Sequence, residues 1–274
     1  MNHGDPTMTP FAALHHRPGR PLLLPNAWDH ASAVALAEAG HAAIGTTSLG
    51  VAAAAGLPDG AAATRAETVR LARRLGPGGF LLSVDAESGF SDDPDEVAAL
   101  AVELAKAGAV GINLEDGRAD GTLAPVAVHA AKVAAVKAAV PELFVNARTD
   151  TYWCAQGAPE PEAETENETE TETLRRLEAY RRAGADGVFV PGLADPAAIA
   201  RVVGAVAVPL NILWTPAGPD LAELASLGVA RVSLGSLLYR SALAAAVATA
   251  AAVAAGEPVG PVPGYAEVQA LNER

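Results

Sequence analysis

The sequence predicts an α/β fold, a TIM-type (β/α)8 barrel, and two observations support this. Apolar strand-like runs and alanine-rich helical runs alternate along the 274 residues, in the roughly eight pairs that close a parallel barrel. The joints between helix and strand also reuse one short phrase. The alternative is an open, doubly wound sheet, but no G-x-G-x-x-G follows the first apolar run.

The expected strands are short apolar runs bounded by glycine, proline or polar residues. They span residues 21–28, 42–48, 80–87, 109–116, 143–152, 187–193, 208–214 and 231–236. The expected helices follow at residues 29–40, 64–75, 93–107, 126–140, 171–183, 196–206, 221–227 and 237–255. Each strand is therefore followed by one helix.

Four joints between a helix and the next strand resemble one another. They read Ala39-Gly40-His41, Ala107-Gly108-Ala109, Ala183-Gly184-Ala185 and Leu227-Gly228-Val229. In each, a glycine stands at the helix C-terminus, where such residues commonly end helices. This weak internal repeat indicates one structural unit used along the chain, so residues 1–274 are expected to form a single barrel domain.

Composition restricts the possible partners and compartment. Half of the residues are hydrophobic but only 4% are aromatic, so the core must consist of Ala, Val and Leu. The formal net charge of −13 argues against nucleic acid or anionic membrane as a partner. A single cysteine, Cys154, excludes an internal disulfide framework. The apolar run 241–255 is too short to span a bilayer, so we expect a soluble cytoplasmic protein.

An acidic insertion follows the fifth expected strand. Residues 158–173 alternate Glu with Pro, Ala, Thr or Asn. Self-repulsion and low hydrophobicity predict a mobile loop. It would rise from the C-terminal face of the barrel, where active sites lie. A lid over the site is one interpretation, but a solvated spacer is preferred.

The stretch Phe80–Phe90 carries the first chemical signal. Asp85 and Glu87 stand at i and i+2 near the end of a buried strand, and such residues point to the same side. Two carboxylates there repel each other unless a cation lies between them or one binds a proton. Oxygen ligands suit Mg²⁺ or Mn²⁺ better than zinc. The alternative is a pair of solvated loop acids or helix N-cap acids.

Polar residues also follow the ends of other expected strands. They are Thr46, Thr47, Ser48, Asp59, Asn113, Glu115, Asp116, Asn146, Arg148, Asp150 and Asn211. An arginine in a barrel mouth needs an anion, either a neighbouring Asp or a substrate carboxylate bound by its guanidinium fork. The spacing around Arg148 leaves both possibilities open. An amide such as Asn211 is more often a satisfied loop residue than a ligand.

Together these motifs resemble the isocitrate lyase/phosphoenolpyruvate mutase superfamily. The resemblance rests on Asp59 in G-L-P-D-G and on the motifs S-V-D-A-E-S-G-F, G-I-N-L-E-D and N-A-R-T-D. V-S-L-G-S-L-L-Y-R near the end is similar to less-characterised bacterial members. The resemblance to the superfamily covers about residues 20–245.

The resemblance implies a Mg²⁺ ion, with Mn²⁺ as a possible substitute, that carboxylates bind partly through water and that chelates a 2-oxo or 2-hydroxy acid. The implied metal set is Asp85, with Glu87, Glu115 and Asp59 beside it or one layer further out. The candidate substrate-binding residues are Thr47, Ser48, Leu49, Asp85, Arg148 and Asn211, and the candidate catalytic residues are Arg148 and Glu115. Tetramers that exchange the last helix are also implied, which would suit residues 237–255, so a homo-oligomer (dimer or tetramer) is expected.

Such a site suits breakage of a C–C bond beside a carbonyl, because Mg²⁺ and Arg148 would stabilise the enolate that forms. We therefore expect a Mg²⁺-dependent lyase that cleaves or decarboxylates small 2-oxo or 2-hydroxy carboxylates. The alternatives are a phosphonopyruvate mutase or hydrolase that acts on a P–C bond, and a 2-oxo-acid-binding homologue with little catalysis.

One departure from the family concerns the general acid. Isocitrate and methylisocitrate lyases carry K-[KR]-C-G-H after the fourth strand, whereas residues 117–125 here contain no Cys, Lys or His. Cys154 matches no family acid and is interpreted as an ordinary thiol. The proton would come from water or from Tyr152, Tyr239 or Arg118.

Overall fold

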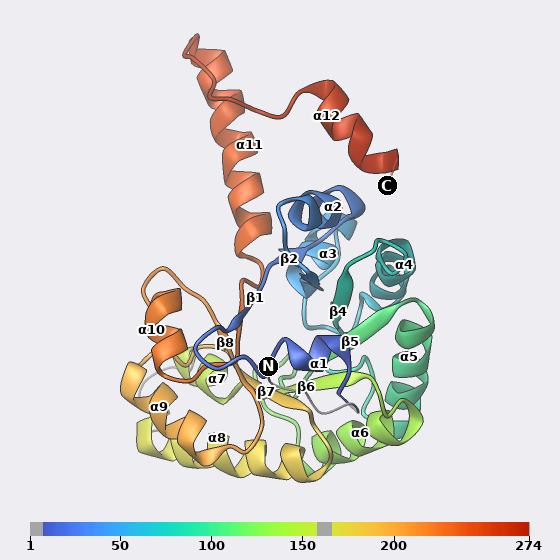
Figure 1. The fold of residues 1–274 in the computed structure, drawn as a ribbon, viewed down its shortest axis with the longest axis vertical. Coiled ribbons are helices and arrows are strands. Elements are labelled where there is room, and N and C mark those ends of the chain that lie inside the picture. Colours follow the sequence, from blue (N-terminus) through green and yellow to red (C-terminus); the bar gives the residue numbers. More distant parts are fainter. Residues whose placement is uncertain (1–7, 158–165, 274) are drawn as a thin grey trace, which may run out of the picture.

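The computed structural model describes residues 8–157 and 166–273, whose strands form one parallel sheet curled into a barrel (Figure 1). The strands are β1 (Leu22–Leu24), β2 (Asn26–Ala27), β3 (Ala43–Thr46), β4 (Leu81–Asp85), β5 (Ala109–Glu115), β6 (Phe144–Arg148), β7 (Gly187–Val190), β8 (Leu210–Leu213) and β9 (Arg231–Ser233). Their order in the sheet is β1-β9-β8-β7-β6-β5-β4-β3-β2.

The ring closes through the first expected strand, which is divided at Pro25. β1 pairs with β9, β2 pairs with β3, and only Pro25 separates β1 from β2. The Asn26 side chain spans the same seam: Nδ2 donates to the carbonyl of Thr46 at 2.8 Å, and Oδ1 accepts the amides of Leu234 and Gly235 at 3.1 and 2.9 Å. The barrel prediction is confirmed, with β1 and β2 as two halves of one strand.

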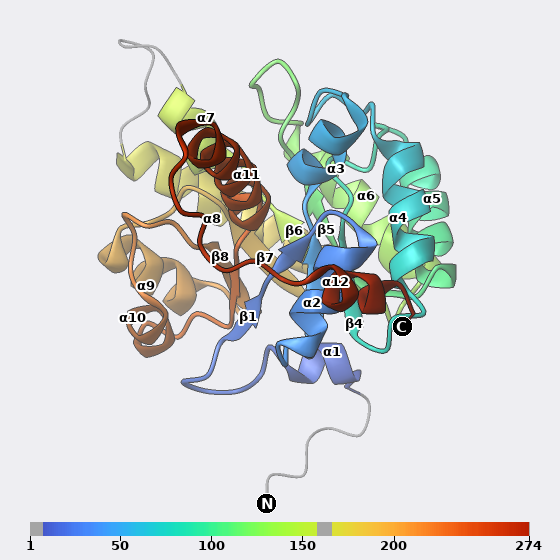
Figure 2. The same cartoon turned by 90° about the horizontal axis from the view of Figure 1, so that it is seen from above.

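Helices surround the strands. They are α1 (Pro10–Ala13), α2 (His30–Glu38), α3 (Ser48–Ala55), α4 (Arg65–Leu75), α5 (Pro94–Lys106), α6 (Val126–Ala139), α7 (Thr151–Gly157), α8 (Glu166–Arg182), α9 (Pro196–Ala205), α10 (Leu221–Ser226), α11 (Leu237–Ala255) and α12 (Tyr265–Ala270), followed by the 3₁₀ helix η1 (Leu271–Glu273). Figure 2 shows α3–α6 on one side of the strands and α7–α10 on the other.

The repeated joint has the backbone that its glycine predicted. Gly40, Gly108, Gly184 and Gly228 have φ values of 96°, 104°, 102° and 87°. This left-handed region strains residues that carry a Cβ and is a common way for a helix to end. The four joints are therefore repeats of one structural device.

The larger apolar clusters lie between the strands and the helices, whereas the barrel interior holds polar groups beside one small apolar cluster of Phe11, Leu22, Leu24, Ala43 and Phe144. Outside the ring, Leu82 and Val84 of β4 belong to the same buried cluster as Leu100 and Leu104 of α5. Inside it, Arg231 of β9 donates to Asn113 of β5 at 3.1 Å, although these strands are not neighbours in the sheet. That hydrogen bond must cross the interior, so charged and amide groups lie beneath the barrel mouth.

Two expected boundaries were wrong. The strand expected at 143–152 ends at Arg148, and Thr151 begins α7. Helix α3 follows β3 directly, with Thr47 at its N-cap position, whereas only the later helix at residues 64–75 was expected. In both places the chain turns from strand into helix within three residues, so an apolar run alone did not mark the end of the strand.

The acidic insertion is also shorter than expected. Residues 158–165 of the predicted loop lie outside the described residues, but residues 166–173 belong to α8, so they do not form a loop. Glu172 pairs with Arg176 at 2.7 Å, and Glu170 pairs with Arg201 at 2.7 Å. These basic partners offset the mutual repulsion of the glutamates, and the buried Thr173 hydroxyl lies 2.6 Å from Thr151 Oγ1 of α7.

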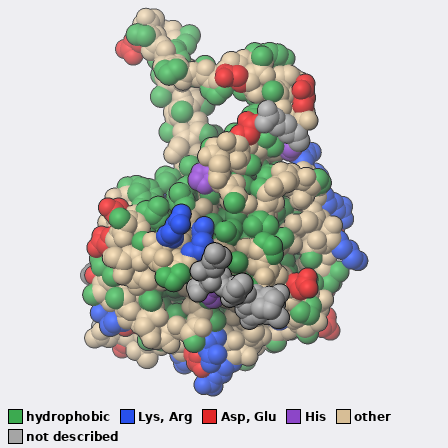
Figure 3. Space-filling view, viewed as in Figure 1, with side chains coloured by type: hydrophobic (Ala, Val, Ile, Leu, Met, Phe, Trp, Pro, Cys, Tyr) green, Lys and Arg blue, Asp and Glu red, His purple; other side chains and the backbone are tan. Residues whose placement is uncertain are grey.

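Helix α11 projects away from the barrel, and α12 returns toward α2 (Figure 1). In α12–η1, the carbonyl of Leu271 lies 3.1 Å from His30 Nε2 of α2. None of the 19 residues of α11 is buried, and Figure 3 shows hydrophobic side chains exposed among backbone atoms along the projecting helix. With a mean hydropathy of 1.6 it is, within the described chain, the one helix long and apolar enough to cross a membrane, so the expectation that this run is too short was wrong.

Candidate active site

The carboxyl ends of β3 to β6 meet at one end of the barrel. In the parallel ladders Asp85 stands opposite Asn113, and Glu115 stands opposite Arg148. Side chains in such register point to the same face of the sheet about 5 Å apart. The topology therefore brings Asp85, Glu115 and Arg148 together, as the sequence predicted.

Two neighbouring cavities, which share part of their lining, lie at this end. The smaller has a volume of about 120 Å³, and its lining includes Thr47, Ser48, Leu49, Asp85, Asn113 and Arg148. The larger has a volume of about 660 Å³, and its lining includes Glu115, Arg118, Asp150 and Cys154. Ser48, Asp59, Arg148 and Trp153 line both. The smaller cavity is the size of a compact ligand group, and the larger one leads to its mouth.

One carboxylate oxygen of Asp85 accepts a hydrogen bond, and the other has no donor within the described part of the chain. Its backbone N–H donates to Thr46 Oγ1 at 2.8 Å, and its Oδ2 accepts the N–H of Ser48 at 3.2 Å. Its Oδ1 is buried and has no hydrogen-bond partner among the described residues. A buried carboxylate oxygen without a donor is costly, so this oxygen is suited to a cation.

Glu87 is held behind Asp85. It is only 2% exposed, and its φ of 47° lies in the left-handed region, which is uncommon outside glycine. Thr64 Oγ1 donates to its Oε1, and its Oε2 is buried without a partner in the described chain. Burial raises the pKa of Glu87, and the charges of Asp85 and Asp59 raise it further.

The charge of Asp85 acts on Glu87, but the two side chains are not related in the expected way. β4 ends at Asp85, so Glu87 reaches the site through a turn and not through the alternation of a strand. The alternative of solvated loop acids is wrong for Glu87 because it is buried, and the N-cap of α5 is Asp93.

Arg148 is clamped by two carboxylates. Its Nη1 lies 2.7 Å from Glu115 Oε2, and its Nε donates to Asp150 Oδ1 at 2.6 Å. Its guanidinium carbon lies 5.6 Å from the centre of the Phe189 ring. Burial alone would lower the pKa of Arg148, but the charges of Glu115 and Asp150 raise it, so Arg148 stays protonated. Nη1 and Nε of Arg148 are therefore paired with neighbouring acids, which is one of the two possibilities left open by the sequence. Arg148 nevertheless lines both cavities, where a substrate carboxylate can reach it.

Glu115 is the most strongly perturbed acid of the site. It is 8% exposed, and burial raises its pKa well above the usual range. The charge of Arg148 opposes this increase in pKa, while those of Asp150, Asp85 and Glu87 add to it. Perturbed acids of this kind concentrate at functional sites.

Asp116 supports the clamp from below. It is fully buried and accepts hydrogen bonds from Thr149 Oγ1 at 2.9 Å, the N–H of Asp150 at 2.9 Å, Arg176 Nη1 at 2.9 Å and Tyr180 Oη at 2.6 Å. With so many donors, Asp116 is a structural ion-pair partner that fixes the backbone of Asp150.

The segment after β3 provides backbone donors. Ser48 and Leu49 form the first turn of α3, whose N-terminus carries partial positive charge. Thr47 stands at the N-cap without a capping hydrogen bond from its side chain. At the cavity mouth, desolvation raises the pKa of Asp59, a hydrogen bond from Ser48 lowers it, and the charge of Asp85 raises it. This arrangement suits a carboxylate ligand beside the acids.

The acids fit a divalent cation that keeps part of its water shell. Among the described residues no three His, Cys, Asp or Glu side chains converge closely enough to enclose an ion by themselves. Mg²⁺ commonly binds through one or two carboxylates and retains several waters. The unpartnered oxygens of Asp85 and Glu87 supply hard ligands of this kind, with Glu115 and Asp59 nearby.

Most of the remaining candidates from the sequence do not line the two cavities or have no special reactivity. Asn211 is buried, and its Nδ2 donates to Ser233 Oγ at 2.9 Å; it is not among the residues that line the two cavities. Burial raises the pKa of the Cys154 thiol, which agrees with an ordinary thiol. Of the three proposed proton donors, Arg118 lines the larger cavity, whereas Tyr152 and Tyr239 are not among its lining residues.

The loop that departs from the lyase pattern is a tight hairpin. Gly117 and Leu123 form an antiparallel bridge, and Arg118 N–H donates to the carbonyl of Thr122 at 2.9 Å. The Arg118 guanidinium donates to Asp92 at 2.6 Å. The loop therefore brings a cation, and no thiol, to the edge of the larger cavity.

Sequence reasoning missed Trp153 and the cavity position of Asn113. Trp153 is 54% exposed and lines both cavities, because α7 starts three residues after β6. Recognising Thr151 as the start of a helix would have placed Trp153 at the mouth. Asn113 was noted at a strand end but given no role.

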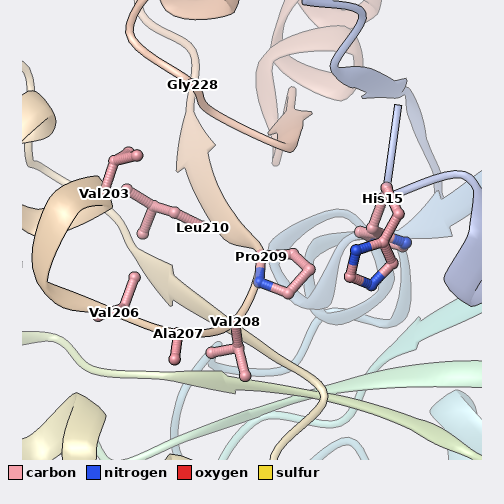
Figure 4. A pocket seen from close by; sticks show the side chains of 9 residues that line it. His15, Val203, Val206, Ala207, Val208, Pro209, Leu210 and Gly228 are labelled. Carbon is pink, nitrogen blue, oxygen red and sulfur yellow. The ribbon is translucent and has the colours of Figure 1, made fainter. Parts of the chain in front are cut away.

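A further cavity lies at the opposite end of the barrel. It has a volume of about 380 Å³, and its wall includes His15, Val203, Val208 and Leu210 (Figure 4). Pro209 and Leu210 mark the amino-terminal end of β8. Active sites of such barrels lie at the carboxyl ends of the strands, so this pocket is not the candidate site.

Comparison with known proteins agrees with the geometry. The family model for phosphoenolpyruvate phosphomutase matches residues 11–254. An uncharacterised Mycobacterium tuberculosis protein is 46% identical over 260 residues, which is 95% of each chain. An oxaloacetate decarboxylase of Ectopseudomonas mendocina is 34% identical over 203 residues, 69% of this chain and 64% of that protein.

A solved structure shows the same fold. The putative phosphonomutase of Burkholderia cenocepacia superposes with a TM-score of 0.80 at 39% identity, over 87% of this chain and 96% of that one. The match of the family model and the relatives above 30% identity extend over most of the barrel. The chain therefore belongs to the phosphoenolpyruvate phosphomutase family, within the isocitrate lyase/phosphoenolpyruvate mutase superfamily, and is an enzyme of that superfamily.

Proposed function

We propose that this enzyme is a Mg²⁺-dependent lyase that cleaves or decarboxylates a C–C bond of small 2-oxo or 2-hydroxy carboxylates. The observation that carries the proposal is the smaller cavity, which Asp85, with its unpartnered Oδ1, lines together with the first turn of α3 and Arg148. A cation site beside a carboxylate site is what a chelated 2-oxo acid requires.

The residues divide the work as follows. Arg148 and the amide of Leu49, in the first turn of α3, bind and orient the substrate carboxylate. Glu115 and Asp150 hold the Arg148 fork so that its orientation is fixed before the substrate arrives. Mg²⁺ held by Asp85, with Glu87, Glu115 and Asp59 nearby, would supply Lewis-acid stabilisation of developing negative charge.

Proton delivery in this enzyme differs from that of the cysteine-dependent lyases. The Arg118 guanidinium stays charged in proteins and is a poor proton donor, and the Cys154 thiol is held neutral by burial. We infer that water in the larger cavity supplies the proton. A decarboxylation, which needs no protein acid, suits this site best.

The test is a comparison of Asp85→Asn with the wild-type enzyme. The isosteric amide removes the anion and should weaken Mg²⁺ affinity at least tenfold and lower turnover of oxaloacetate by about 100-fold. Calorimetry of Mg²⁺ binding and a pyruvate-release assay over a panel of 2-oxo and 2-hydroxy acids measure both. Glu142→Gln, at an exposed acid near the opposite end of the barrel, is the matched control. Full Mg²⁺ affinity and full turnover in Asp85→Asn would refute the assignment.

A second candidate is a mutase or hydrolase that acts on the P–C bond of phosphonopyruvate. Its support is the 39% identity to the putative phosphonomutase. Turnover of phosphonopyruvate well above that of oxaloacetate would favour it. Saturable oxalate binding without turnover on either panel would instead favour a binding protein with little catalysis.

We also propose a cytoplasmic homo-oligomer that exchanges α11 between subunits. Its support is the exposed apolar surface of α11, which no described part of the same chain covers. The single cysteine agrees with a reducing compartment.

A further inference from the structure

Arg231 is the largest fully buried side chain of the described molecule, and the proposed function gives it no role. It lies inside the barrel, where its Nε donates to Ser233 Oγ at 3.1 Å and its Nη2 donates to Asn113 Oδ1 at 3.1 Å. Burial lowers its pKa to about 9, so it remains protonated at neutral pH. Burying a cation that forms no ion pair with a carboxylate costs folding free energy. A functional role for Arg231 would explain why this cost is tolerated.

The contact with Arg231 determines how the Asn113 amide is oriented. A guanidinium has donors and no acceptor, so the Asn113 atom that faces Arg231 must be the carbonyl oxygen. Asn146 Nδ2 donates to the same oxygen at 2.9 Å. Because two donors contact Oδ1, the positions of Oδ1 and Nδ2 cannot be exchanged. The usual ambiguity of an amide flip is therefore removed for Asn113.

Since Oδ1 is occupied in this way, Nδ2 is the atom of the Asn113 amide that remains available to a ligand in the smaller cavity. Asn113 lines the smaller cavity and stands opposite Asp85 in the ladder. Within the described residues its Nδ2 has no hydrogen-bond partner. Asp85, whose Oδ1 is also unpartnered, lines the same cavity.

We propose that Asn113 Nδ2 is a substrate-binding donor that hydrogen-bonds to an oxygen of the bound 2-oxo acid, and that Arg231 is the positioning residue that fixes it. The proposal rests on the proposed function and extends it by one contact. A carboxylic acid ligand held by a cation satisfies both orphan groups at once, because the cation faces Asp85 while a ligand oxygen accepts from Asn113. A neutral or cationic ligand would leave one of them unsatisfied.

The test measures two affinities, Mg²⁺ alone and oxalate in saturating Mg²⁺, by calorimetry. Asn113→Ala removes the donor, and the isosteric Asn113→Asp replaces it with an acceptor. We expect oxalate affinity to fall about tenfold in Asn113→Ala and about 100-fold in Asn113→Asp, while Mg²⁺ affinity is retained in both. Ser83→Ala, at a buried hydroxyl two positions before Asp85 on β4, is the control and should bind oxalate like the wild type.

Arg231 is tested by loss and rescue. Arg231→Met keeps the bulk but frees the Asn113 amide to flip, so oxalate affinity should fall about tenfold. Arg231→Lys restores a group that can only donate, and should recover most of the affinity. Thermal unfolding identifies a variant that fails to fold, and the two Asn113 variants then decide the question.

The outcomes separate the two proposals. Oxalate affinities of both Asn113 variants within twofold of the wild type would overturn this inference and leave the proposed function standing. Failure of the wild type to bind oxalate with Mg²⁺ would overturn both. Parallel loss of Mg²⁺ and oxalate affinity in both Asn113 variants would show a structural role and would also overturn the inference.

Discussion

Gly117 lies where a single methyl group would disturb the active site. A Cβ at this position would come within 2.2 Å of Asp150 Oδ2, and Asp150 holds Arg148 at 2.6 Å. We predict that Gly117→Ala displaces Asp150 and lowers kcat/KM by about 10- to 100-fold, because small misplacements of orienting groups are costly. Steady-state kinetics with the best substrate of the panel measures this.

A glycine in open space provides the control for that prediction. A Cβ at Gly204 in α9 meets no atom within 4 Å. Gly204→Ala should leave kcat/KM unchanged and stabilise the protein by about 0.5–1 kcal/mol. Equal activities of the two alanine variants would show that the Asp150–Arg148 contact does not matter for turnover.

His15 should make the stability depend on pH. Burial, together with the charges of Arg231, His16 and Arg17, lowers its pKa from 6.5 to about 3, although the hydrogen bond to the Phe11 carbonyl opposes this decrease. The unfolded chain therefore binds a proton below about pH 6.5 that the folded chain does not bind until about pH 3. Stability should fall with decreasing pH in that window, by at most ~1.4 kcal/mol per pH unit from this residue.

The variant His15→Gln cannot titrate and isolates this contribution. Urea unfolding at pH 7, 6, 5 and 4 should show a shallower acid loss in His15→Gln than in the wild type. His129, whose pKa burial lowers to about 4, contributes to both proteins alike. Parallel pH profiles for the two proteins would contradict the assignment.

The sequence placed most of the candidate site residues at one end of the barrel but predicted few of their contacts. Asp85, Glu115 and Arg148 could be predicted because strand ends in a parallel barrel meet at one edge. The left-handed backbone of Glu87 and the two-carboxylate clamp on Arg148 could not, because they depend on turns and on side-chain rotamers. Asn211 was placed at the substrate because its strand end is near, whereas its amide bonds to Ser233.

Among the elements, α8 fixes the support of the site. Its Arg176 reaches Asp116, which is fully buried, at 2.9 Å. We predict that Arg176→Met destabilises the protein by about 3 kcal/mol, because the Asp116 charge loses its cationic partner. Urea unfolding measures the loss.

An exposed ion pair on the same helix is the matched control. Arg182 pairs with Glu178 at 2.7 Å, but its side chain is 74% exposed. Arg182→Met should change stability by less than about 0.5 kcal/mol, since exposed pairs contribute little. Similar effects of the two substitutions would argue against the Asp116 pair as a special support.

Element types were predicted better than element ends. Repeated glycines gave the joints between helix and strand, because a left-handed backbone is a local requirement. Helices α3 and α7 were missed because each starts directly where a strand ends, with no intervening turn signal. The start of α8 was missed because its acids pair with arginines, one of them in α9, and that pairing appears only once the helices pack.

At the scale of the whole molecule, the exposed apolar side chains of α11 lead to a prediction about the oligomeric state. Leu243 and Val247 are 50% and 71% exposed. We predict that the double variant Leu243→Glu, Val247→Glu shifts the protein from oligomer to monomer, because burial of these side chains against a second copy would be lost. Light scattering after gel filtration measures the mass.

A substitution of the same kind elsewhere is the control. Leu221 in α10 is 40% exposed, and Leu221→Glu should leave the mass unchanged. A wild-type protein that is monomeric, or that sediments with liposomes, would contradict subunit exchange of α11 and favour another partner for its apolar surface.

The seam at Asn26 has a consequence for biosynthesis. The residues that Asn26 grips, Leu234 and Gly235, are made more than two hundred positions later, and Gly235 and Ser236 line the smaller cavity. Before β9 has been synthesised, the sheet therefore cannot close, because β1 and the Asn26 side chain lack their partners. Ligand affinity should arise only after β9 and the segment that follows it have left the ribosome.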